Sequence, residues 1–185
     1  HEIYSIIRVC QVKGGFAIAC GDAGIGKTKA IKKYIKDNPN NSVLITVNPC
    51  FTSVKSILKI VAERIGATPE KSKDALWLSV AGKLRDGMVL IFDEAQHLTL
   101  QTIEVLRSFS DYFNDKGQTL GIIFIGNVET VGRIGSKKAE FSQIVNRSKQ
   151  TKIYSVSEIK REDIQKLFPI IAENNREIDF LWRIA

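Results

Sequence analysis

Hydrophobic residues in this chain occur in short runs that are separated by longer segments with helical periodicity. Five runs have the length of a strand and are largely apolar; they cover residues 16–20, 43–47, 88–92, 120–125 and 152–156. Runs without regular polar alternation are typical of strands buried on both faces, as in parallel sheets covered by helices. We therefore expect an α/β fold with a five-stranded parallel sheet and helices on both faces.

The segments between these runs carry the start and stop signals of helices. Thr52 or Ser53 can cap a helix that ends at Gly66, and further helices are expected over 2–11, 27–36, 72–86 and 99–113. Two short helices are expected within 128–147, and from residue 158 onward the pattern is helical only. The pattern divides the chain into an N-terminal helix (1–13), an α/β domain (14–157) and a helical segment (158–185).

Composition narrows the class of protein. The 185 residues are 44% hydrophobic, which is typical of a globular domain, and the net charge of +7 favours an anionic partner. No apolar run approaches the roughly 20 residues that span a bilayer, so we expect no membrane association. Cys10, Cys20 and Cys50 lack the spacing of metal ligands, which favours reduced thiols and a cytoplasmic location.

The most specific motif is a glycine-rich loop between the first strand and the next helix. It matches the pattern G-x-x-x-x-G-K-[ST] in full, with Gly21, Asp22, Ala23, Gly24, Ile25, Gly26, Lys27 and Thr28. Backbone N–H groups of such a loop wrap phosphate oxygens, and the helix N-terminus adds its positive end. We expect Lys27 to reach the β- and γ-phosphates and Thr28 to ligate Mg²⁺, and we count Lys29 among the nucleotide-binding residues. The alternative is a glycine turn without a ligand.

Two adjacent carboxylates end the third strand. Asp93 is expected to hold Mg²⁺ beside Thr28, and Glu94 to orient and deprotonate the attacking water. The alternative is an exposed acidic turn. The wording Asp-Glu-Ala-Gln-His superficially resembles a helicase box, but the chain has no room for a second motor domain. His97 is interpreted as a loop residue because no second metal ligand lies four positions on.

Asn127 ends the fourth strand and would face the γ-phosphate if that strand lies between the first and third. A turn-forming Gly-Asn pair is the alternative. The order and spacing of the three motifs resemble the AAA+ ATPases. The resemblance implies the strand order 5-1-4-3-2, Asn127 as first sensor, ATP with Mg²⁺ as cofactor, and an arginine supplied by the neighbouring subunit. We carry that arginine onto Arg147, with Arg133 as the competitor; Arg107 could instead pair with Glu104.

The residues of two motifs, Asp93-Glu94-Ala-Gln-His-Leu and Phe-Ile-Gly-Asn127, are also similar to those of the transposition ATPases of Mu-like phages and Tn7-like elements. This similarity implies a phage-encoded or bacterial ATPase that assembles as a ring or filament on duplex DNA and recruits a transposase. Type II secretion ATPases share the sequence Asp-Glu-Ala-Gln, so an ATPase acting on protein partners is the alternative. A nucleotide-switched module with little hydrolysis is another. The family's helical lid would begin within 158–185, where Arg176 and Arg183 are doubtful substitutes for its second sensor.

Basic residues are concentrated after the fourth strand. Residues 129–152 hold six basic side chains and two acidic ones. We expect Arg133, Lys137 and Lys138 to contact DNA phosphates without reading base edges, with solvated charge as the alternative. Thr52 and Lys55 form a second candidate contact with DNA, because AAA+ rings often line their pore at this position.

Overall fold

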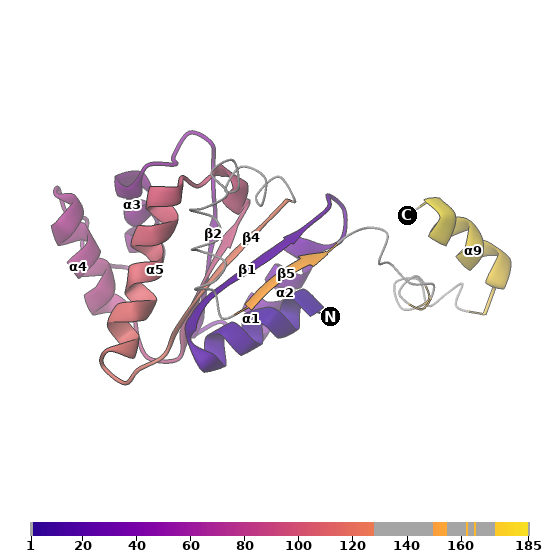
Figure 1. Ribbon diagram of the computed structural model, residues 1–185, viewed down its shortest axis with the longest axis horizontal. Helices are drawn as coiled ribbons and strands as arrows, with labels where there is room; N and C mark the ends of the chain where they lie inside the picture. The colour runs from indigo at the N-terminus through magenta and orange to yellow at the C-terminus, as the bar shows by residue number, and fades with distance from the viewer. Residues whose placement is uncertain (1, 128–149, 155–161, 163–164, 166–172, 185) are drawn as a thin grey trace. The chain divides into compact units, whose positions relative to one another are not determined.

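The computed structural model describes residues 2–127, 150–154, 162, 165 and 173–184 of the chain. The chain divides into two compact units, His1–Ile153 and Tyr154–Ala185, which are described separately. The first unit is built on a sheet with strand order β2-β3-β4-β1-β5 (Figure 1). The strands are β1 (Gly15–Gly21), β2 (Ser42–Thr46), β3 (Met88–Asp93), β4 (Leu120–Gly126) and β5 (Gln150–Tyr154).

The observed strand order is the expected order 5-1-4-3-2. The pairs β2–β3, β3–β4 and β4–β1 are parallel, with β1 and β4 in register from Gly15 opposite Gly121 to Cys20 opposite Gly126. The sheet has the five strands expected, and parallel pairing is recorded for the four strands β2, β3, β4 and β1. β5 lies at the edge beside β1, and its sequence QTKIY is more polar than the runs in the other strands, in keeping with an edge position.

Helices cover both faces of the sheet, as the apolar strands require. One face packs against α1 (Glu2–Lys13) and α2 (Lys27–Asp37), and the other against α3 (Val54–Ile65) and α5 (Leu100–Asn114). The helix α4 (Lys73–Lys83) packs on α3, in a second layer away from the sheet (Figure 1). Alternate residues of each strand face opposite layers, so Ile122 and Phe124 of β4 belong to the core beneath α3 and α5.

The expected helix starts are confirmed by their capping hydrogen bonds. The hydroxyls of Ser53, Ser72 and Thr99 accept hydrogen bonds from backbone N–H groups three residues on, at 3.2, 3.1 and 3.2 Å. Each bond satisfies an N–H group that has no partner inside its helix. Gly66 ends α3 with φ of 68°, a conformation that glycine adopts without steric cost.

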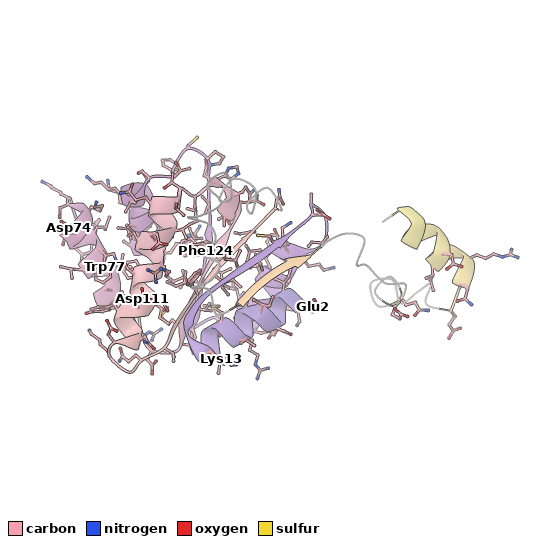
Figure 2. The ribbon with its side chains drawn as sticks, viewed as in Figure 1. Glu2, Lys13, Asp74, Trp77, Asp111 and Phe124 are labelled. Carbon is pink, nitrogen blue, oxygen red and sulfur yellow. The ribbon has the colours of Figure 1, made fainter. Side chains whose placement is uncertain are left out.

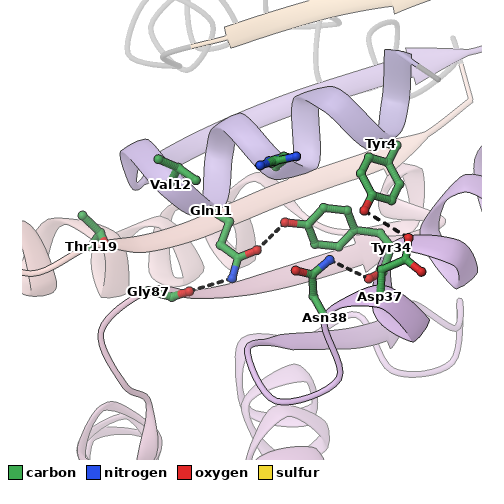
Figure 3. Close-up of a pocket in the computed structure, with 9 residues that line it drawn as sticks. Tyr4, Gln11, Val12, Tyr34, Asp37, Asn38, Gly87 and Thr119 are labelled. Carbon is green, nitrogen blue, oxygen red and sulfur yellow. Dashed lines mark hydrogen bonds between the residues drawn. The ribbon is translucent and has the colours of Figure 1, made fainter.

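The helix α1 approaches the sheet closely at Gly121 of β4. A Cβ atom at Gly121 would lie 2.6 Å from the carbonyl oxygen of Cys10, so only glycine fits there. The buried Cys10 thiol lies 3.5 Å from the carbonyl oxygen of Ile122. Gln11 joins α1 to two other elements: its amide donates to the carbonyl of Gly87 at 2.8 Å and accepts a hydrogen bond from the hydroxyl of Tyr34 in α2 (Figure 3). The contacts explain why the N-terminal helix is part of the first unit.

On the other face an aromatic contact fixes α4 against α5. The Trp77 ring stacks on Phe109 with centroids 4.7 Å apart, and its indole N–H donates to the Ser108 hydroxyl at 3.0 Å. Figure 2 shows Trp77 on the side of α4 that faces α5, while Asp74 lies in the first turn of α4. The Trp77 contact therefore fixes the side of α4 that packs against α5.

The second unit contains the helix α9 (Asn175–Ile184). Its Ile178 is fully buried, and the side-chain oxygen of Asn174 accepts hydrogen bonds from the N–H groups of Arg176 and Glu177 at 3.2 and 3.4 Å. Arg176 itself is exposed. Within the described parts of the chain, no helix is long and apolar enough to cross a membrane.

Candidate nucleotide-binding site

The glycine-rich loop lies where β1 ends and α2 begins. Gly24 and Gly26 both have φ of 85°, in the left-handed region that other residues enter only with strain. Gly26 is the N-cap residue of α2, and no side chain caps that helix. The first N–H groups of α2 are therefore available for an anion, which the positive end of the helix dipole favours.

Lys27 is folded back against this loop. Its side chain is only 7% exposed, and its ammonium group donates to the carbonyls of Gly21 at 2.9 Å and Asp22 at 2.8 Å. A third hydrogen bond, of 3.1 Å, reaches the side-chain oxygen of Asn127 at the end of β4. All three donor positions of the ammonium are thus directed at groups around the loop. A phosphate oxygen would replace one of these neutral acceptors and form a charge-assisted hydrogen bond with the ammonium.

Thr28, the last residue of the phosphate loop, lies beside Asp93, the last residue of β3. The Thr28 hydroxyl donates to a carboxylate oxygen of Asp93 at 3.0 Å. Burial raises the pKa of Asp93, while the hydrogen bonds from Thr28 and from the N–H of Glu94 lower it. Asp93 is 2% exposed, and a carboxylate with so little solvent is stabilised by a cation.

These two residues fit a Mg²⁺ ion because hydroxyl and carboxylate oxygens are hard ligands of the kind that Mg²⁺ takes. Among the described residues there is no group of three or more His, Cys, Asp or Glu side chains that could hold a metal. A cation at Thr28 and Asp93 would therefore depend on phosphate oxygens and water for its remaining ligands. The donor set is that of a metal bound together with a nucleotide.

Glu94 follows with an unusual backbone conformation. It has φ of 57° and is the only residue besides glycine with positive φ in the described part of the chain. Strain of this kind persists only where the surroundings impose it, and it is common at functional sites. The turn directs the chain into η1, a short 3₁₀ helix over Ala95–His97. The Glu94 carboxylate accepts a hydrogen bond from the side-chain amide of Gln96.

Asn127 takes the position that the strand order gives it. It follows β4, which lies between β3 and β1, and Gly126 pairs with Cys20 just before the phosphate loop. The side-chain oxygen of Asn127 therefore meets Lys27, while its backbone N–H donates to the Gln96 side-chain oxygen at 3.3 Å. The sequence motifs predicted that Asn127 would lie near the phosphate loop, but the contribution of Gln96 was missed because no local pattern marks it.

The other residues that the sequence analysis assigned to nucleotide or DNA contacts lie partly inside and partly outside the described residues. Lys29 and Lys55 are exposed on the first turns of α2 and α3, and Thr52 is half-buried, with its carbonyl accepting a hydrogen bond from the Thr102 hydroxyl at 2.9 Å. Arg133, Lys137, Lys138 and Arg147 lie outside the described residues. The sequence-based roles of all these residues stay predictions.

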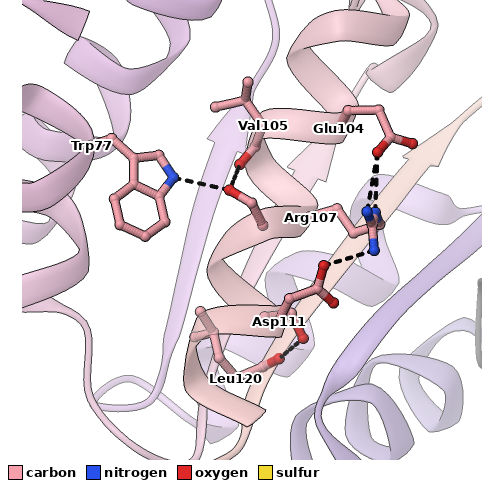
Figure 4. Close-up of polar contacts among 8 residues, drawn as sticks. Trp77, Glu104, Val105, Arg107, Asp111 and Leu120 are labelled. Atoms are coloured by element: carbon pink, nitrogen blue, oxygen red, sulfur yellow. Dashed lines mark hydrogen bonds and ion pairs between the residues drawn. The ribbon is translucent and has the colours of Figure 1, made fainter. Parts of the chain in front are cut away.

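Arg107 forms its ion pairs with residues of its own helix, α5. It donates to Glu104 at 3.2 Å and to Asp111 at 2.7 Å, on consecutive turns of α5 (Figure 4). This is the pairing that the spacing of Arg107 and Glu104 predicted.

Comparison with known proteins extends the description of the site. A family model described as an AAA domain matches residues 11–134. The chain is 27% identical over 191 residues to the ATP-dependent target DNA activator B of Escherichia phage Mu, a match that covers all of this chain and 58% of that protein. It is 29% identical over 172 residues to the Mu-like prophage FluMu DNA transposition protein B of Haemophilus influenzae, covering 89% of this chain and 56% of that protein. The chain thus spans little more than half the length of these relatives.

Among solved structures, the ORC2 protein of Aeropyrum pernix has a similar fold. The TM-score is 0.66 with 14% sequence identity, and the match covers 93% of this chain and 50% of that one. The fold agrees with the family model, which covers more than half of the chain and includes the phosphate loop, Asp93, Glu94 and Asn127. This chain therefore belongs to the AAA family of P-loop domains.

Proposed function

We propose that this chain is a Mg²⁺-dependent ATPase that binds duplex DNA without sequence specificity and promotes DNA transposition by recruiting a transposase. The observation that carries the nucleotide part is the pair of contacts Thr28–Asp93 and Lys27–Asn127. They bring a hydroxyl, a carboxylate, an ammonium group and an amide together beside a loop built to wrap phosphate. The transposition part is supported by the similarity to the phage Mu and FluMu proteins.

The residues of the site divide the work of hydrolysis. Lys27 and the N–H groups of the loop residues Gly21 to Thr28 would bind the phosphates, and Lys29 lies at the rim of the same loop. Thr28 and Asp93 would hold Mg²⁺, which offsets phosphate charge when bound. Glu94 would accept a proton from the attacking water, and Asn127 would orient that water. Arg147 of a neighbouring subunit would stabilise the charge that develops on the leaving phosphate.

The proposed DNA contacts are electrostatic. Arg133, Lys137 and Lys138 would contact phosphates from the basic segment 129–152, and Thr52 and Lys55 would provide a second contact after β2. Contacts of this kind release counterions, so binding should weaken steeply with salt and vary little with sequence. Assembly as a ring or filament would place several such segments along one duplex. The resulting binding would depend on ATP if nucleotide is bound between subunits.

ATP hydrolysis with and without duplex DNA tests the proposal. Wild-type chain should hydrolyse ATP, and DNA should stimulate the rate. Glu94→Gln should bind a fluorescent ATP analogue with wild-type affinity but hydrolyse ATP at least about a hundredfold more slowly, as is usual when a general base is removed. A Glu94→Gln variant with the wild-type rate would contradict the assigned role of Glu94.

The two alternatives give different results in the same assay. An ATPase that acts on protein partners would hydrolyse ATP with no stimulation by DNA. A nucleotide-switched module would bind ATP, and its residual turnover would be the same in Glu94→Gln. Stimulation by DNA that is lost in Lys137→Ala/Lys138→Ala, while nucleotide affinity is kept, would exclude both.

A further inference from the structure

The polar residues of the site are joined into a ring by hydrogen bonds and by the main chain between Lys27 and Thr28. Thr28 donates to Asp93 at 3.0 Å, and the second oxygen of Asp93 accepts from the N–H of Glu94 at 3.0 Å. From Glu94 the ring continues to Gln96, then to Asn127, and closes through Lys27, which is the neighbour of Thr28 in the chain. Every member except Gln96 already has a role in the proposed hydrolysis.

Gln96 occupies the one position in this ring that needs a donor and an acceptor on the same side chain. Its Nε2 amide group donates to the Glu94 carboxylate, and its Oε1 oxygen accepts from the backbone N–H of Asn127 at 3.3 Å. A carboxamide offers both on separate atoms at the end of a flexible stem, without depending on its protonation state. A glutamate here would place two carboxylates in contact, and an aliphatic residue would leave Glu94 and the Asn127 N–H without these bonds.

The location of Gln96 makes its orientation well defined. It lies in η1, the turn that the positive φ of Glu94 initiates, and its side chain is 8% exposed. The turn contacts β4, so Gln96 spans from the end of β3 to the end of β4. A hydrogen bond to a charged group in a site with little solvent is stronger and more directional than the same bond in water.

We propose that Gln96 is a positioning residue for ATP hydrolysis, which holds the carboxylate of Glu94 and ties it to the strand end that carries Asn127. The inference rests on the proposed function, because it gives Gln96 a part in the reaction assigned to Glu94. A general base must lie within hydrogen-bond reach of the water it deprotonates, so a carboxylate free to rotate would be productive for a smaller fraction of the time. Removing the amide should lower kcat and leave nucleotide affinity intact.

The contact itself can be tested without nucleotide by NMR. The side-chain NH₂ resonances of Gln96 can be assigned as those that disappear in Gln96→Met. In Glu94→Ala these resonances should shift and exchange faster with water, and the backbone N–H of Asn127 should shift in Gln96→Met. The exposed Gln101 on α5 provides the matched control, since Gln101→Met should leave the Asn127 signal unchanged. Gln96 resonances that do not respond to Glu94→Ala would overturn the inference.

Kinetics then test the role in the reaction. Loss of one hydrogen bond to a charged group corresponds to roughly a tenfold fall in rate. We expect Gln96→Met and Gln96→Glu to lower kcat by about that factor with the Kd for ATP within about twofold of wild type. In a Glu94→Gln background, Gln96→Met should cause no further loss, because Gln96 acts through Glu94.

The outcomes separate this inference from the proposed function. A wild-type chain that does not hydrolyse ATP contradicts the proposed function, and the role of Gln96 in hydrolysis with it. A wild-type chain that hydrolyses ATP while Gln96→Met has the same kcat contradicts the inference alone. A Gln96→Met variant that loses nucleotide affinity, or loses rate equally in both backgrounds, shows a structural role and also contradicts the inference.

Discussion

At the scale of single residues, the site depends on two charged side chains that have little contact with solvent. Lys27 is compensated by three oxygen acceptors, and Asp93 by one hydroxyl and one N–H group. Burial of a charge is unfavourable without such partners. A bound ligand of opposite charge would complete the compensation, so each buried charge favours ligand binding. Lys27 and Asp93 therefore give the most direct tests of the nucleotide site.

Lys27→Ala should abolish tight nucleotide binding. The substitution removes the ammonium that is aimed at the loop and leaves the carbonyls of Gly21 and Asp22 without its hydrogen bonds. We expect the Kd of a fluorescent ATP analogue to rise by at least about tenfold, corresponding to a charge-assisted hydrogen bond. Lys32→Ala, which removes an exposed charge from the same helix, is the matched control and should bind as wild type does.

The pKa of Asp93 predicts how stability depends on pH. Burial raises this pKa above the ordinary value of 3.8, so at pH values between the unfolded and folded pKa the native state binds more protons than the unfolded state. Stability that comes from the retained proton is complete below the unfolded pKa and is lost as the pH rises through the folded pKa. Without Mg²⁺, Asp93→Asn should therefore melt at a higher temperature than wild type at pH 7.

This difference should shrink as the pH falls toward the ordinary range of an aspartate. Thermal unfolding of both proteins in EDTA from pH 5 to 8 checks the trend. Addition of Mg²⁺ and ATP should raise the melting temperature of wild type and have little effect on Asp93→Asn. A wild type that is the more stable protein at pH 7 in EDTA would show that the carboxylate is not destabilised by burial.

At the scale of elements, the fold depends on how α1 lies against the sheet. The helix is close enough to β4 for the Cys10 carbonyl to occupy the space of a side chain at Gly121. Gln11 then links α1 to α2 and to the residue before β3. The contact positions α1 over the strands β1 and β4, whose other ends carry the phosphate loop and Asn127.

Gly121→Ala should destabilise the first unit. The added Cβ would meet backbone atoms of α1, which cannot move aside as a side chain can, so α1 must shift. We expect a loss of about 1–3 kcal/mol in the free energy of unfolding, as is typical of overpacking. Gly82→Ala is the matched control: nothing lies within 4 Å of the added Cβ in α4, and alanine favours the helix by up to about 1 kcal/mol. Urea denaturation of the two variants should show changes of opposite sign.

The sequence predicted the strands and the helix starts because these depend on local patterns. Apolar runs marked β1 to β4, and Thr52 or Ser53 was recognisable as the cap of α3. The helix starts expected at residues 72 and 99 coincide with the caps of α4 and α5. The phosphate loop and the acidic strand end are also continuous in sequence. Gly121 and Gln96 were not predicted, since the need for glycine arises from a helix 111 positions earlier in the chain and the Gln96 contact joins two strand ends. Parallel pairing of β5 with β1 was expected from the alternation of strands and helices, and it stays a prediction.

At the scale of the whole molecule, we propose that the candidate nucleotide site is coupled to DNA binding. The nucleotide site lies entirely within the first unit, His1–Ile153. The chain matches little more than half the length of its phage relatives, so activities of the full-length relatives come to it only as proposals. Three of the basic residues proposed to contact DNA, Arg133, Lys137 and Lys138, lie within about a dozen positions after Asn127 in the sequence. A change at Asn127 when ATP binds would thus occur a few residues before the segment that is proposed to bind DNA.

The proposed coupling can be tested by co-sedimentation with duplex DNA, with and without ATP and at low and moderate salt. We expect the chain to sediment with DNA of any sequence only when ATP and Mg²⁺ are present, and we expect moderate salt to weaken the binding. Lys137→Ala/Lys138→Ala should lose it, whereas Lys71→Ala/Lys73→Ala, an equal change of charge at exposed positions near α4, should retain it. If the chain binds ATP but does not sediment with DNA under any of these conditions, the proposed ATP-dependent DNA binding is wrong.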